Sequence, residues 1–108
     1  MTRVAVVGAG SWGTAVAAIV ADNAPTTLWA RRAALAASIE AEHENPDYLP
    51  HIRLPDSLRS SADLAAVCCD ADVVVFAVPS HGLRAVLADA KPYVDPGAAI
   101  VSLAKGIE

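Results

Sequence analysis

The sequence GAGSWG at residues 8–13 constrains the fold of this chain more than any other feature. It follows the apolar run RVAVV at residues 3–7 and precedes TAVAAIVA at residues 14–21. β-Branched residues at successive positions indicate a strand buried on both faces, and the spacing of the small apolar residues predicts a helix. A glycine-rich loop between a buried strand and a helix is typical of a βαβ unit that binds a dinucleotide.

We call residues 8–13 the glycine loop. Gly8 permits a tight turn out of the strand, Gly10 lets a pyrophosphate approach the backbone, and Gly13 lets the helix pack closely on the strand. The free N–H groups and the dipole of the first helical turn favour a phosphate there. The alternative is a tight turn that binds no ligand.

Ser11 and Trp12 occupy the variable positions of the loop. Ser11 can offer a phosphate its N–H and its hydroxyl, and Trp12 can lie over a cofactor. The alternative for Trp12 is a partly buried packing residue.

The residues after the second predicted strand, residues 26–30, bear on the choice of cofactor. NAD-specific domains usually place an Asp or Glu there to bind the ribose 2′-hydroxyl. This chain has Arg31 and Arg32 and no acid. A guanidinium binds a 2′-phosphate through its planar fork, so the sequence favours NADP(H), with NAD(H) as the second choice. Alternatively, both arginines are solvated residues at a helix start.

Helices and strands alternate along the rest of the chain. Further helices are expected over residues 31–42, 62–69 and 80–90, and further strands over residues 58–61, 72–78 and 99–103. This alternation predicts an α/β fold of the Rossmann type: a doubly wound, mainly parallel sheet with helices on both faces and strand order 3-2-1-4-5. The length of 108 residues fits a single domain, which we expect over residues 1–108.

Composition excludes several classes of function. The net charge is −4, so binding of nucleic acid through a basic surface is not expected. No apolar run reaches the roughly 18 residues of a membrane span, and a cytoplasmic location is expected. Cys68 and Cys69 are neighbours, a geometry that rarely allows a disulfide, and we expect two reduced thiols on a helix. No set of residues has the spacing of metal ligands.

Two segments are expected at the edge of the sheet where ligands bind, beyond the carboxyl ends of the strands. Pro79 would stiffen the backbone beside the nicotinamide. His81 can serve as an acid or base, or be an ordinary exposed residue of a first helical turn. Lys105 can meet an anionic substrate or the cofactor, or be a solvated surface residue.

Five motifs together resemble the bacterial NAD(P)-dependent glycerol-3-phosphate dehydrogenases. They are GAGSWGTA at residues 8–15, LWARR at 28–32, NPDYLP at 45–50, VPSHGLR at 78–84 and SLAKGIE at 102–108. The resemblance implies reduction of dihydroxyacetone phosphate to sn-glycerol 3-phosphate for glycerophospholipid synthesis. It implies cofactor contacts from Ser11, Trp12, the arginine pair and Tyr48, and contacts of Lys105 with both cofactor and substrate.

Members of that family are longer than this chain. The resemblance implies a helical C-terminal domain, absent here, which supplies the lysine that transfers the proton and through which a homodimer can form. We therefore expect a fragment that is inactive by itself. The alternatives are a reductase of the 3-hydroxyacid, 6-phosphogluconate or ketopantoate type, or a stand-alone module that senses dinucleotides.

Overall fold

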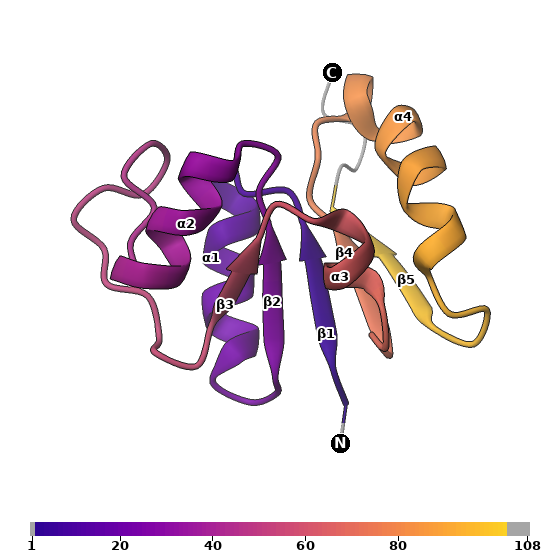
Figure 1. Cartoon of the computed structure of the whole chain (residues 1–108), viewed down its shortest axis with the longest axis horizontal. Helices are drawn as coiled ribbons and strands as arrows, with labels where there is room; N and C mark the ends of the chain where they lie inside the picture. Colours follow the sequence, from indigo (N-terminus) through magenta and orange to yellow (C-terminus); the bar gives the residue numbers. More distant parts are fainter. Residues whose placement is uncertain (1, 104–108) are drawn as a thin grey trace.

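The structure is a computed structural model and describes residues 2–103 (Figure 1). A five-stranded sheet forms its centre, in the order β3-β2-β1-β4-β5, and every neighbouring pair is parallel. This order confirms the predicted doubly wound topology. The strands are β1 (Val4–Val7), β2 (Thr26–Trp29), β3 (Arg59–Ser61), β4 (Val73–Phe76) and β5 (Ala99–Ser102).

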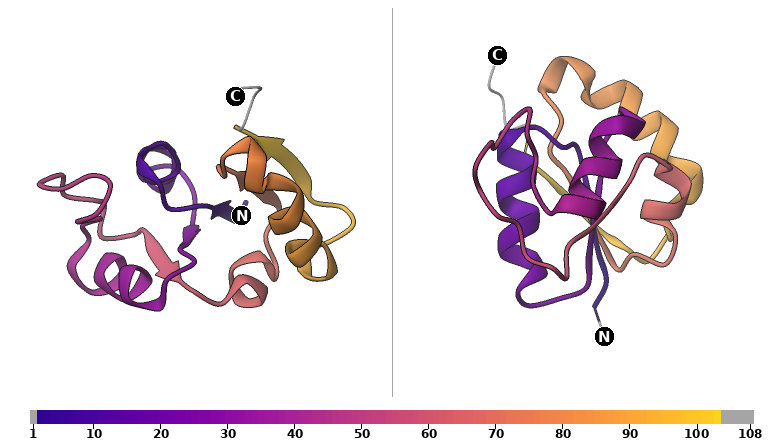
Figure 2. Two further views of the ribbon diagram at one scale, coloured as in Figure 1. Left: turned by 90° about the horizontal axis from the view of Figure 1, so that it is seen from above. Right: turned by 60° about the vertical axis from the view of Figure 1, so that its left-hand side comes forward.

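Helices cover both faces of the sheet (Figure 2). On one face, α1 (Ser11–Ala21) and α2 (Ala33–Glu42) contribute Ala17 and Ile39 to one hydrophobic core. On the other face, α3 (Leu64–Cys68) and α4 (Ser80–Ala90) contribute side chains to a second core, and the short 3-10 helix η1 (Lys91–Tyr93) follows α4. The crossovers therefore lie on both sides of the sheet, as expected.

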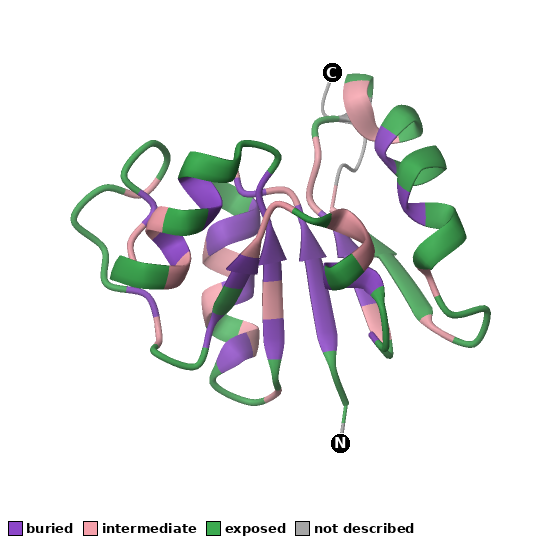
Figure 3. Cartoon of the chain, in the orientation of Figure 1, coloured by how far each residue is buried: buried purple, intermediate pink, exposed green. Residues whose placement is uncertain are grey.

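The central strand β1 separates the two cores. Val4 and Val6 face the core beneath α1 and α2, whereas Ala5 and Val7 face the other. All four residues are buried, which confirms the prediction of a strand covered on both faces. In contrast, all four residues of the edge strand β5 are exposed (Figure 3).

Several element boundaries differ from the prediction. Helix α1 begins at Ser11 rather than at residue 14, because residues 11–13 already form its first turn and the N–H of Thr14 donates to Gly10 O at 2.9 Å. Strand β4 ends at Phe76 rather than at residue 78, because Phe76 pairs with Val7, where β1 itself ends. Both differences lie at the edge of the sheet where β1 and β4 end.

Helix α2 starts at Ala33 rather than at residue 31, whereas α4 spans Ser80–Ala90, as predicted. Arg32 is extended and precedes α2, so both arginines lie outside the helix. Pro79 occupies the N-cap position of α4, and no side chain caps the start of this helix. Within residues 2–103, no helix is long and apolar enough to cross a bilayer.

Candidate dinucleotide-binding site

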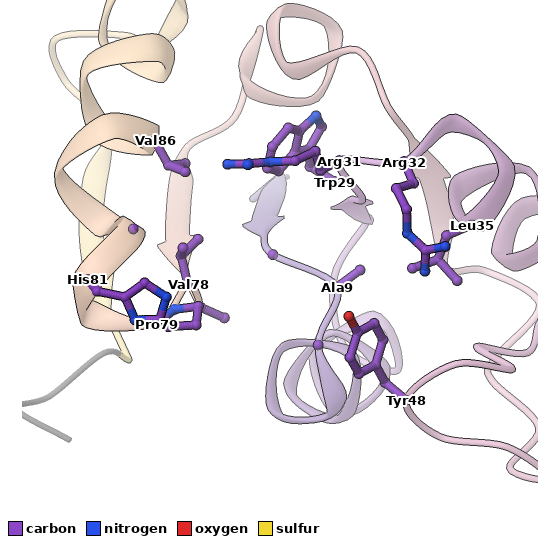
Figure 4. Close-up of a pocket in the computed structure, with 14 residues that line it drawn as sticks. Ala9, Trp29, Arg31, Arg32, Leu35, Tyr48, Val78, Pro79, His81 and Val86 are labelled. Atoms are coloured by element: carbon purple, nitrogen blue, oxygen red, sulfur yellow. The ribbon is translucent and has the colours of Figure 1, made fainter. Parts of the chain in front are cut away.

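A cavity of about 490 Å³ opens where β1, β2 and β4 end (Figure 4). Its position between β1 and β4 is where the strand order reverses, which is where doubly wound sheets bind ligands. Its walls are formed by the glycine loop, the end of β2, residue 48 and the turn between β4 and α4. The lining residues are Gly8, Ala9, Gly10, Trp29, Arg31, Arg32, Leu35, Tyr48, Ala77, Val78, Pro79, His81, Gly82 and Val86.

Two glycines of the loop are required by the packing of the protein itself. Gly8 has φ +120°, a conformation that side chains disfavour, and a Cβ atom there would lie 2.6 Å from Ala77 O. A Cβ atom on Gly13 would lie 2.0 Å from Gly8 O. The turn and the close packing of α1 on the loop therefore exclude any side chain at these positions.

Gly10 differs from both, because a Cβ atom there would meet no protein atom within 4 Å. It stands directly before α1, where no side chain caps the helix. The first-turn N–H groups of a helix have no partner within the helix, and its N-terminus attracts anions. Open space beside an uncapped helix start fits a pyrophosphate group.

Ser11 and Trp12 are exposed on the first turn of α1, outside the cavity wall. The Trp12 side chain is 64% exposed, so the alternative of a partly buried packing residue is wrong. Contact of either residue with a cofactor stays a prediction.

The two arginines after β2 both line the cavity but differ in their surroundings. Arg32 forms an ion pair with Asp47, whose carboxylate raises the pKa of the guanidinium. Arg31 takes part in none of the ion pairs within residues 2–103. In Figure 4, Arg31 points toward Val86 of α4, whereas Arg32 points toward Leu35 of α2.

We call residues 45–50 the tyrosine loop. Tyr48 lines the cavity and is 49% exposed, so its ring is available to a ligand. Asn45 at the start of the loop is fully buried, and its Nδ2 donates to Ala9 O at 2.9 Å and to Thr14 Oγ1 at 2.8 Å. The Asn45 side chain thus links the tyrosine loop to the glycine loop by a hydrogen bond.

Sequence reasoning missed Asn45, Trp29 and Leu35 as parts of this region. An asparagine before a proline is typical of a turn, and the sequence gives no sign of its buried hydrogen-bond partners. Trp29 reads as a strand residue, although its ring lines the cavity and its Nε1 donates to Ala62 O at 3.0 Å.

The β4–α4 turn forms the wall opposite the tyrosine loop in Figure 4. Pro79 and His81 line the cavity there, and both are exposed. His81 lies in the first turn of α4, as expected. The predicted substrate contact, Lys105, lies outside the described residues.

Comparison with known proteins identifies the family. The family model for the N-terminus of NAD-dependent glycerol-3-phosphate dehydrogenases matches residues 3–108. The chain belongs to this family. The match confirms the resemblance inferred from the motifs and decides against the 3-hydroxyacid, 6-phosphogluconate and ketopantoate reductases.

Curated glycerol-3-phosphate dehydrogenases of the NAD(P)+ type are similar to almost the whole chain. A Streptomyces coelicolor enzyme is 51% identical over 107 residues, and a Sphingopyxis alaskensis enzyme is 49% identical over 106 residues. The alignments cover 98% of this chain and 32% of each relative. The chain therefore spans about a third of the length of these relatives.

A solved glycerol-3-phosphate dehydrogenase from Saccharomyces cerevisiae has the same fold. It superposes with a TM-score of 0.90 at 31% identity, covering 99% of this chain and 34% of the yeast chain. As an N-terminal domain of this dehydrogenase family, the chain is a nicotinamide dinucleotide-binding domain. The cavity beside the glycine loop is the place in the fold that suits this ligand.

Proposed function

We propose that this chain binds NADP(H) in preference to NAD(H). The observation that carries the proposal is the arginine pair at the end of β2, where both side chains line the cavity and no acid follows the strand. A carboxylate at this position would repel a 2′-phosphate, whereas a guanidinium binds it through paired hydrogen bonds. Arg31, which pairs with none of the described acids, is the stronger candidate of the two.

The whole protein, in this proposal, interconverts dihydroxyacetone phosphate and sn-glycerol 3-phosphate. Reduction adds a hydride to the carbonyl carbon and a proton to its oxygen, and the bound dinucleotide supplies the hydride. Residues of this chain bind and orient that dinucleotide: Gly10 leaves room for the pyrophosphate, and Pro79 stiffens the wall beside the nicotinamide. A charged Lys105 would stabilise the substrate phosphate or the reacting oxygen.

Several finer assignments belong to the same proposal. Contacts of Ser11, Trp12 and Tyr48 with the cofactor follow from the family resemblance, as does a proton-transferring lysine beyond this chain. A homodimer and a cytoplasmic location stay predictions.

The double charge reversal Arg31→Glu with Arg32→Glu tests the choice of cofactor. We expect NADPH affinity to fall at least about a hundredfold, since two charge-assisted contacts are lost and two repulsive ones are introduced. NADH affinity should change by less than about tenfold, because NADH has no 2′-phosphate. Titration calorimetry of both cofactors measures the two effects. Unchanged NADPH affinity would show that the arginines do not bind the phosphate.

A further inference from the structure

Asn45 is the largest buried polar side chain within residues 2–103, although the tyrosine loop that contains it is otherwise mostly exposed. Every hydrogen-bonding atom of the side chain has a partner. Nδ2 donates to Ala9 O and Thr14 Oγ1, and Oδ1 accepts from the N–H of Tyr48 at 3.2 Å. A buried amide satisfied on both ends holds its partners in one arrangement.

Two partners of the Asn45 side chain, Ala9 and Tyr48, line the cavity and belong to different loops. Ala9 lies in the glycine loop between Gly8 and Gly10, and Thr14 follows that loop in α1. Tyr48 belongs to the tyrosine loop, within which the N–H of Leu49 also donates to the backbone oxygen of Asn45 at 2.9 Å. The side chain of Asn45 therefore links the backbone of Tyr48 to the backbone of the glycine loop.

We propose that Asn45 is a positioning residue for dinucleotide binding, acting through the glycine loop and Tyr48. The inference rests on the proposed function, because it assumes that the cavity binds NADPH. Asn45 is fully buried and lines no part of the cavity, so it would act without touching the ligand. It keeps the two walls preorganised, so that the cofactor does not have to order the tyrosine loop when it binds.

The substitution Asn45→Asp tests this role, because it preserves shape and the acceptor for Tyr48 but removes the donor to Ala9 O and Thr14 Oγ1. We expect NADPH to bind about tenfold more weakly, because the substitution removes the two buried hydrogen bonds that Asn45 Nδ2 donates. Asn23→Asp is the matched control, because it makes the same chemical change at an exposed residue beyond the C-terminal end of α1. Affinity is measured by calorimetry well below the melting temperature of each variant.

A double-mutant cycle with Tyr48→Ala separates positioning from a general loss of stability. If Asn45 acts through Tyr48, Asn45→Asp weakens binding less in the Tyr48→Ala background than in the wild type. Purely additive effects would overturn the proposal, as would an Asn45→Asp variant that binds NADPH within about twofold of the wild type. A wild-type protein that binds no NADPH would instead contradict the proposed function itself.

Thr14 offers a milder pair of variants if Asn45→Asp does not fold. Thr14→Val removes the hydroxyl that accepts from Asn45, whereas Thr14→Ser keeps it. We expect Thr14→Val to weaken NADPH binding about threefold and Thr14→Ser to leave it near the wild-type value. Equal affinities of the two variants would overturn the proposal.

Discussion

At the scale of single residues, the three glycines of the glycine loop meet different requirements. Gly8 and Gly13 are needed by the fold, because a Cβ atom at either would press on backbone atoms. Gly10 is surrounded by open space, so nothing in the described protein requires it to lack a side chain. In the proposed function, the ligand is what requires glycine at position 10. Substitutions at Gly8 or Gly13 should therefore lower stability, whereas substitutions at Gly10 should lower cofactor binding.

The variants Gly10→Val and Gly13→Ala test this separation. Gly10→Val should remove NADPH binding by filling the pyrophosphate space, while costing no more than about 1 kcal/mol of unfolding free energy as a poorer helix cap. Gly13→Ala should cost about 2 kcal/mol or more, because the added methyl group overpacks the contact with Gly8 O. Chemical denaturation and cofactor titration together measure both properties. Retained NADPH binding by Gly10→Val would place the pyrophosphate elsewhere.

The ion pair between Arg32 and Asp47 leads to a second prediction at this scale. Asp47 pairs with Arg32 and, in the proposed function, would place a negative charge near the bound 2′-phosphate. Asp47→Asn should therefore raise NADPH affinity about threefold, the size expected for an exposed charge pair, and leave NADH affinity unchanged. The control is Asp56→Asn, because Asp56 pairs with Arg53 outside the cavity wall. Equal changes for both cofactors would show that Asp47 does not act on the 2′-phosphate.

At the scale of elements, α3 is a short helix whose residues at either end differ in their surroundings. Asp63 caps its start, with the carboxylate accepting from the N–H of Ala66 at 3.3 Å. At its end, Cys68 is buried in the core beneath α3 and α4, whereas the next residue, Cys69, is exposed. Burial raises the pKa of the Cys68 thiol, which keeps it protonated at neutral pH.

The two cysteines should consequently react at very different rates. Iodoacetamide should modify Cys69 in the native protein and reach Cys68 only after the protein is unfolded, because the thiolate is the reactive form. Mass spectrometry of timed samples counts the modified thiols, and Cys69→Ser serves as the control that removes the fast reaction. Modification of both cysteines at similar rates would contradict the burial of Cys68.

The elements themselves were largely predictable from sequence, and their ends were not. The order and direction of all five strands follow from alternation of apolar strands and Ala-rich helices. Strand β4 stops at Phe76 because its partner β1 stops, which is a property of pairing rather than of local sequence. The role of Asn45 could not be predicted for the same reason, because its partners Ala9 and Thr14 are more than 30 residues away along the chain.

At the scale of the whole molecule, the site depends on contributions from distant parts of the chain. The glycine loop follows β1, the arginines follow β2, and the turn with Pro79 follows β4, yet all line one cavity. Parallel strands bring their carboxyl ends to one edge, so the fold itself assembles the binding site. The motifs predicted these three contributions, whereas the hydrogen bonds by which Asn45 links the tyrosine loop to the glycine loop became visible only in the structure.

The most direct test of this account is the affinity of the purified protein for NADPH compared with NADH, measured by titration calorimetry at fixed salt. We predict measurable binding of NADPH that is at least about tenfold tighter than binding of NADH, because only NADPH presents a 2′-phosphate to Arg31. Equal affinities, or tighter binding of NADH, would contradict the proposed role of the arginine pair.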